Sequence, residues 1–160
     1  VKMEEKFKNL PLRNGVGIIV LNNKNKVFVA KRIDNPKDFW QMPQGGVDDG
    51  EDFIQAAYRE LEEETSIKNV DLIQELEDSI IYELPDHLLG LIWKGKYRGQ
   101  KQKWFVMRFT GDDSEINIKT KKPEFLDWKW IEIDQITNVV VDFKLNVYKE
   151  LKAQLKKLLI

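Results

Sequence analysis

Acidic side chains crowd one short stretch of the chain, from Gly45 to Glu64, where Arg59 is the one base. If residues 52–65 form a helix, Glu60, Glu63 and Glu64 fall at positions i, i+3 and i+4 and share one face. Like charges at this spacing repel each other, so the face gains from a bound cation. Carboxylate oxygens without histidine or cysteine suit Mg²⁺, with Mn²⁺ as a second possibility. The eight acids are Asp48, Asp49, Glu51, Asp52, Glu60, Glu62, Glu63 and Glu64.

A solvated acidic helix face is the competing interpretation, and the charge run alone favours it. Two neighbouring features favour a site instead. The segment Trp40–Gly46 contains Pro43 and paired glycines, which allow backbone to lie open beside a ligand. Arg59 follows Glu51 by eight residues, about two helical turns, so it can pair with an acid near the helix start and fix the loop.

The same stretch resembles the Nudix box, Gly-x5-Glu-x7-Arg-Glu-U-x-Glu-Glu-x-Gly-U with U aliphatic, which is the signature of Nudix hydrolases. Ser66 stands where the family has its last glycine, which changes the exit from the helix and leaves the carboxylates in place. The matching positions are Gly45, Glu51, Arg59, Glu60, Leu61, Glu63, Glu64 and Ile67.

Further segments between about Gly15 and Tyr148 resemble the branch of this family that holds bacterial RNA pyrophosphohydrolases, also described as dinucleoside polyphosphate hydrolases. The segments are Trp40–Gly46, Gly99–Phe105, Pro123–Phe125 with Trp128 and Trp130, and Phe143–Lys144 with Val147–Tyr148. The resemblance implies an α/β/α sandwich around a mixed sheet. It also implies metal-binding and catalytic roles for Glu60, Glu63, Glu64 and Glu124, a metal contact at Gly45, and structural roles for Gly45, Glu51 and Arg59.

The general base stays open among Glu63, Glu64 and Glu124, since spacing does not separate them. For the substrate, the resemblance implies that Arg32 contacts phosphates and that Phe143 and Lys144 contact the 5′-terminal base. From the residues alone, Lys31 and Arg32 are as consistent with an exposed strand end as with an anion site.

Trp93–Trp104, read as WKGKYRGQKQKW, holds five bases and no acid between its aromatic residues. Aromatic and basic side chains together suit base stacking and phosphate neutralisation, so this stretch is predicted to be a substrate arm that includes Lys101 and Lys103. The alternative is a solvated hairpin tip between aromatic strand ends.

Composition narrows the class of protein. The chain has 160 residues, of which 33% are charged and 42% hydrophobic, and its net charge is −1. This composition fits one α/β domain over residues 1–160 and argues against a disordered chain or a protein that coats nucleic acid through excess positive charge. There is no cysteine, and His87 is the one histidine, so thiolate chemistry and multi-histidine zinc sites are excluded. No apolar run approaches the ~20 residues of a membrane span, and the expected location is the cytoplasm. The oligomeric state is left open.

Hydrophobic periodicity predicts the elements that carry these residues. The helix at 52–65 is expected to bury Phe53, Ala56, Ala57 and Leu61. His87 is interpreted as a loop residue. The other expected elements are a hairpin of strands 16–21 and 26–32, one or two strands in 72–84, strands at 104–109 and 125–131, and an amphipathic helix in 143–160 that packs on the core.

These features lead to the hypothesis of a metal-dependent hydrolase that converts the 5′-triphosphate or diphosphate end of RNA to a monophosphate. Hydrolysis of dinucleoside polyphosphates such as diadenosine tetraphosphate is the alternative within the same chemistry. A non-catalytic RNA-binding module would not need the three helix glutamates, and an acidic protein-interaction domain would show no dependence on metal.

Overall fold

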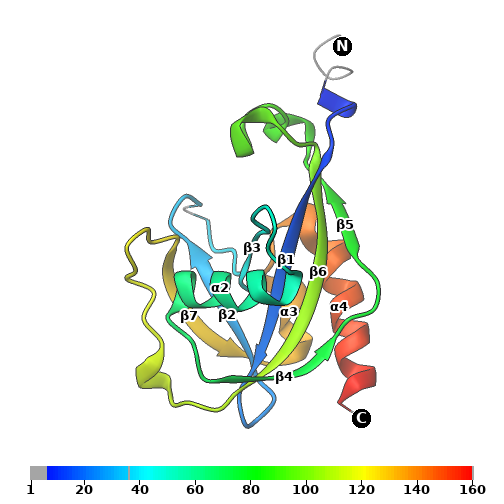
Figure 1. Ribbon diagram of the computed structural model, residues 1–160. Helices are drawn as coiled ribbons and strands as arrows, with labels where there is room; N and C mark the ends of the chain where they lie inside the picture. The colour runs from blue at the N-terminus through cyan, green and yellow to red at the C-terminus, as the bar shows by residue number, and fades with distance from the viewer. Residues whose placement is uncertain (1–6, 36, 160) are drawn as a thin grey trace.

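The computed structural model describes residues 7–35 and 37–159, which form a mixed sheet with helices on both faces (Figure 1). The strand order is β4-β6-β1-β2-β7, with β3 paired to β1 and β5 paired to β6. β1 and β6 run parallel along their whole length, whereas the other pairs are antiparallel. The strands are β1 (Leu12–Leu21), β2 (Val27–Arg32), β3 (Gln44–Gly46), β4 (Val70–Glu75), β5 (Ile80–Glu83), β6 (Gly99–Phe109) and β7 (Phe125–Ile131).

Helix α2 (Phe53–Thr65) covers one face of the sheet, and α3 (Ile136–Val139) and α4 (Leu145–Leu158) cover the other (Figure 1). Because strand side chains alternate between faces, β1 sends Ile18 to the core under α2 and Ile19 to the core under α4. The predicted α/β/α sandwich and the amphipathic C-terminal helix are therefore confirmed. Short 3₁₀ helices complete the fold: η1 (Asp86–Leu88), η2 (Ile92–Gly95), η3 (Asp113–Glu115), η4 (Ile133–Gln135) and η5 (Asp142–Lys144).

Helix α2 begins and ends where its sequence directs. Asp52 is the N-cap, and its backbone N–H donates to Gln55 Oε1 at 3.3 Å in a capping box. Ser66 ends the helix in the left-handed region at φ 66°, which glycine adopts without strain and which costs another residue about 1–2 kcal/mol. Its hydroxyl donates to Asn117 O at 2.8 Å, which helps to hold this exit.

The prediction that Phe53 faces the core is wrong, since Phe53 is 41% exposed. Phe53 lies in the first turn at the edge of the buried stripe, and Ile54 packs against the core instead. Ala56, Ala57 and Leu61 are fully buried as predicted.

The strand predicted at 104–109 begins five residues earlier, at Gly99, so the second half of the predicted substrate arm is part of the sheet. Buried and less buried residues alternate along residues 100–103 as in a strand, although the many basic residues there suggest an exposed segment. Gln100 and Gln102 are fully buried. Gln102 Nε2 donates to Gln100 Oε1 at 2.7 Å and Trp104 Nε1 donates to Gln102 Oε1 at 3.1 Å, whereas Gln100 Nε2 has no partner among the described residues.

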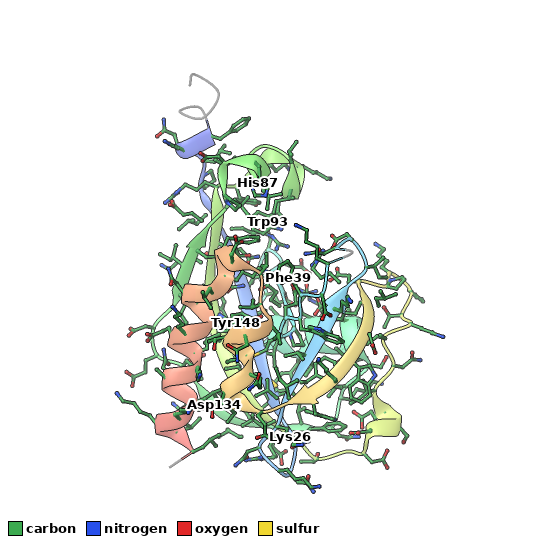
Figure 2. All side chains as sticks on the ribbon, turned by 180° about the vertical axis from the view of Figure 1, so that it is seen from behind. Lys26, Phe39, His87, Trp93, Asp134 and Tyr148 are labelled. Carbon is green, nitrogen blue, oxygen red and sulfur yellow. The ribbon has the colours of Figure 1, made fainter. Side chains whose placement is uncertain are left out.

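The remaining elements follow the predicted pattern. The 16–32 segment is a hairpin with Asn25 in the left-handed region at φ 59°, and residues 72–84 contribute two strands, β4 and β5. His87 lies exposed in η1, in the segment between β5 and β6 (Figure 2). Within residues 7–35 and 37–159, no helix combines the length and apolar character needed to cross a bilayer.

Candidate active site

Arg59 clamps helix α2 to the glycine loop. Its guanidinium donates to both carboxylate oxygens of Glu51, at 2.7 and 2.9 Å, and to Gly46 O at 2.9 Å. The bonds from Arg59 are the main reason that the pKa of Glu51 is lowered to about 2. Glu51 Oε1 also accepts the backbone N–H of Asp48 at 3.0 Å. The pairing predicted from the eight-residue spacing is thus confirmed, and it closes the loop against the helix.

The same guanidinium partly neutralises the acidic face. Arg59 Nη1 donates to Glu60 Oε1 at 2.9 Å and to Glu63 Oε2 at 3.2 Å. Glu60 lies directly against Gly45, because a β-carbon added at Gly45 would be 2.1 Å from Glu60 Cδ. Only glycine leaves room for this carboxylate, and the burial that results raises the pKa of Glu60.

The carboxyl groups of Glu64 and Glu124 lie next to each other, at the buried end of the acidic face of α2. Glu64 is 4% exposed, and its Oε2 has no hydrogen-bond partner among the described residues. Burial and then the adjacent Glu124 carboxyl raise the pKa of Glu64 well above its ordinary value. Glu124 is placed by the backbone N–H of Ile33, which donates to Glu124 O at 2.9 Å and ties the loop before β7 to the end of β2.

These carboxyl groups share a cavity of about 890 Å³. Its lining consists of Arg59, Glu60, Glu62, Glu63, Glu64, Ser66, Lys68, Thr120, Lys121, Lys122 and Glu124. In the part of the chain that is described, no three acidic or histidine side chains already converge on one point as a closed set of metal ligands. An open arrangement fits magnesium, which takes one or two carboxylates and fills its other positions with water and substrate phosphates. The unpartnered oxygen of Glu64 beside a second carboxyl is a place where a divalent cation would relieve an electrostatic cost.

A second cavity, of about 510 Å³, contains the residues predicted to contact phosphate and base: Arg32, Phe143 and Lys144. Lys144 is buried, and its Nζ reaches Gln41 Oε1 at 3.4 Å. Burial, with a smaller contribution from Arg32, lowers the pKa of Lys144 to about 7. Aromatic side chains form much of the remaining wall, including Trp93 and Phe39, which Figure 2 labels on this side of the molecule.

Arg32 lines the second cavity and lies near the acidic centre of the first. Its guanidinium donates to both carboxylate oxygens of Asp34, at 2.8 and 2.7 Å, and these bonds are the main reason that its pKa is raised. Glu124 and Glu64 also contribute to that shift, so the guanidinium lies within electrostatic reach of the acidic centre. A phosphate bound at Arg32 would therefore lie between the aromatic cavity and the carboxylates.

Three other predicted substrate residues lie elsewhere. Lys31 Nζ donates to Asp38 at 3.3 Å, and Lys103 Nζ donates to Glu77 O at 2.7 Å. Lys101 is exposed on β6. None of the three lines either cavity. Lys101 and Lys103 are two positions apart on β6, so they share a face of the strand, and neither side chain reaches the lining residues of a cavity.

Arg13 is a neighbour of the glycine loop that the sequence reasoning missed. A β-carbon at Gly46 would lie 2.3 Å from an Arg13 guanidinium nitrogen, and the guanidinium carbon lies 5.4 Å from the centre of the Trp93 ring. The predicted strand starts at residue 16, whereas β1 starts at Leu12 and includes Arg13. The signal that could have found it is the pairing of the start of β1 with β3 at Gly15 and Gly46, which no local pattern reveals.

An acidic centre clamped to a glycine loop, beside a basic and aromatic cavity, suits a substrate that carries a chain of phosphates. Fold and site together define the class of the protein as a phosphoanhydride hydrolase that works with divalent metal ions.

The chain belongs to the Nudix family: the NUDIX domain model matches residues 11–152. A curated relative from Pelagibacter ubique, named RNA pyrophosphohydrolase, is 70% identical over 157 residues, with 98% of this chain and 99% of the relative covered. A relative of the same name from Rhodospirillum rubrum is 48% identical over 146 residues, with 91% and 88% covered.

Solved structures share the fold. The dihydroneopterin triphosphate pyrophosphohydrolase of E. coli aligns with a TM-score of 0.70 at 21% identity and covers 90% of this chain and 99% of its own. An Ap4A hydrolase from C. elegans aligns with a TM-score of 0.63 at 21% identity, over 89% and 98% of the two chains. At this identity the likeness concerns the fold alone.

Proposed function

We propose that this chain is an RNA 5′-pyrophosphohydrolase that uses Mg²⁺ to convert 5′-triphosphate or diphosphate ends of RNA to 5′-monophosphates. The observation that carries the proposal is the position of Arg32, which lines the aromatic cavity and lies within electrostatic reach of Glu64 and Glu124 in the acidic cavity. The relatives named RNA pyrophosphohydrolase match nearly the full chain, so the assignment does not rest on the box alone.

In this proposal the protein binds the two ends of the substrate separately. The 5′-terminal base lies against the ring of Phe143, beside the amine of Lys144, and Arg32 holds the phosphate next to it. Gly45 allows Glu60 to lie against the loop, and Arg59 keeps that loop closed over the helix. The substrate is then held in position before the chemical step. Such positioning lowers a large part of the barrier to phosphoryl transfer.

The carboxylates Glu60, Glu63, Glu64 and Glu124 would hold the metal. Bound Mg²⁺ supplies neutralisation of phosphate charge and a lowered pKa for water. Glu63 is the carboxylate best placed to accept a proton from water, because its side chain is 60% exposed at the cavity while one oxygen is held by Arg59. Glu64 and Glu124 are the alternatives for this role.

The test is a competition between 5′-triphosphorylated RNA and diadenosine tetraphosphate, with Mg²⁺ and with a chelator. We expect faster turnover of the RNA and no activity with the chelator. Faster turnover of the dinucleotide would replace the proposal with its alternative, dinucleoside polyphosphate hydrolysis, which the same metal chemistry supports. The expected site of action is the cytoplasm, which stays a prediction.

A further inference from the structure

The larger cavity has two walls of opposite charge. The acidic wall is helix α2 with Glu124, and the other wall is the loop between η3 and β7, which contributes Thr120, Lys121 and Lys122. The proposed function uses the acidic wall alone. The loop residues line the same cavity, and the proposed function gives them no role.

The charges of this loop are available to a ligand. Among the described residues, neither Lys121 nor Lys122 has a carboxylate within ion-pair distance, whereas Lys68 on the same cavity pairs with Glu62 at 3.7 Å. Thr120 adds a hydroxyl oxygen that is buried and has no hydrogen-bond partner in the described structure. A buried polar group without a partner destabilises the protein, so such groups ordinarily mark a place where a ligand or water completes the bonding.

The loop is also held in place. The backbone N–H of Asn117 donates to Thr65 O at 2.9 Å, and Ser66 Oγ donates to Asn117 O at 2.8 Å, which fixes one end to α2. The bond from Ile33 N–H to Glu124 O fixes the other end to β2. The backbone that carries the two exposed lysines is therefore held beside the cavity at both ends of the loop.

The direction of the substrate follows from the two cavities. The base and the phosphate nearest to it occupy the cavity of Phe143 and Arg32, and the acidic centre lies beyond Arg32. The terminal phosphates therefore extend into the larger cavity, toward Lys121 and Lys122. Cleavage adds water across one phosphoanhydride bond and gives RNA monophosphate and pyrophosphate, so one bridge is replaced by two phosphate groups that carry more negative charge. Ammonium groups on the far wall would stabilise that charge as it develops.

We infer that Thr120, Lys121 and Lys122 form the binding site for the terminal phosphates of the substrate and for the pyrophosphate that leaves. The inference rests on the proposed function for its ligand, but inorganic pyrophosphate is a probe that does not require RNA. The competing role for the lysines is to offset the charge of the α2 glutamates without contacting phosphate.

The experiment compares the wild-type chain with the double variant K121A/K122A and with K119A as the matched control. Lys119 is exposed on the same loop and does not line the cavity. Binding of pyrophosphate in Mg²⁺ is measured by calorimetry, and Mg²⁺ binding alone is measured in parallel. Thermal denaturation confirms that each variant is folded.

We expect the double variant to bind pyrophosphate about tenfold more weakly, a change of about 1.4 kcal/mol, and K119A to stay within about twofold of the wild type, because Lys119 does not line the cavity. Mg²⁺ alone should bind the double variant as tightly as the wild type or more tightly, because positive charge has been removed from its surroundings. T120V should weaken pyrophosphate binding without a change in charge.

Equal pyrophosphate affinity in the double variant and the wild type would overturn the inference, as would no binding by the wild type. Substrate kinetics separate this outcome from the proposed function. Lysine-dependent pyrophosphate binding in a protein that leaves RNA uncleaved would support the phosphate site and refute the RNA activity. RNA cleavage with lysine-independent pyrophosphate binding would do the reverse.

Discussion

Replacing Glu64 by glutamine should stabilise the metal-free protein while it weakens the binding of metal. Glu64 is buried with one oxygen unpartnered, and its neighbour is the carboxyl of Glu124. A buried charged or polar group without a partner costs about 1–3 kcal/mol. The amide of glutamine carries no charge, and its NH₂ group can donate to Glu124 at every pH, so E64Q keeps a bond to Glu124 without the cost of a buried charge.

The magnitude follows from that cost. A gain of about 2 kcal/mol raises the melting temperature of a domain of this size by about 4–8 °C. Thermal denaturation in chelator at pH 7.5 measures it, with E62Q as the control because Glu62 is exposed on the same helix, where a substitution changes stability by less than about 0.5 kcal/mol. In excess Mg²⁺ the order should reverse, since only the wild type gains the full binding free energy.

The pH dependence of the stability difference between E64Q and the wild type is an independent check of the predicted direction. The pKa of Glu64 is raised in the folded state, so the folded protein holds its proton more tightly than the unfolded chain does. Stability from this group is therefore fully present below its ordinary pKa of 4.5 and is lost as the pH rises through the raised value. The advantage of E64Q in chelator should be large at pH 7.5 and small near pH 4.5. A variant that melts at or below the wild type in chelator at pH 7.5 would refute the reasoning.

Four further substitutions test other parts of the site. E63Q should lower turnover by about two orders of magnitude or more with the melting temperature unchanged, as pyrophosphate release and thermal denaturation will measure; near-normal turnover would assign Glu63 to the solvated face. G45A should weaken Mg²⁺ binding about tenfold or more, because the new methyl group meets Glu60 at 2.1 Å, and titration of Mg²⁺ checks this. K144M should remove a rise in stability between pH 7 and 10.5, since the lowered pKa of Lys144 means that the unfolded chain binds the extra proton over this range; denaturant midpoints at the two pH values would contradict this if wild type and variant changed alike. R32A should raise the KM for triphosphorylated RNA by about tenfold with little change in melting temperature, and a protein that fails to fold would give Arg32 a structural role instead.

The sequence was most informative where function depends on spacing within one helix. The intervals from Glu51 to Arg59 and from Glu60 to Glu64 imply a clamp and a shared acidic face without knowledge of the rest of the chain, because helix geometry converts spacing into direction. The predicted helix at 52–65 and the observed helix at Phe53–Thr65 agree for the same reason.

Prediction failed where the surroundings of a residue decide its role. The density of bases in residues 93–104 predicts a single substrate arm. In the structure Gln100 and Gln102 lie inside the sheet, and their burial depends on β1 as the parallel neighbour. Phe53 fits the helical pattern yet lies at the exposed edge of the contact with the sheet. The periodicity of one segment does not show how far the neighbouring element extends, and that extent decides which residues are buried.

The sequence by itself therefore determined the acidic helix, its arginine clamp, the hard-ligand chemistry and the class of reaction. The resemblance already pointed to Glu124, but only the tertiary structure brings its carboxyl beside Glu64, places Arg13 against Gly46, and puts Lys121 and Lys122 in the same cavity. The physical reason is that an i, i+4 relation is fixed by covalent geometry and hydrogen bonds within one turn, whereas these contacts depend on the strand order and on loops anchored far away in the chain.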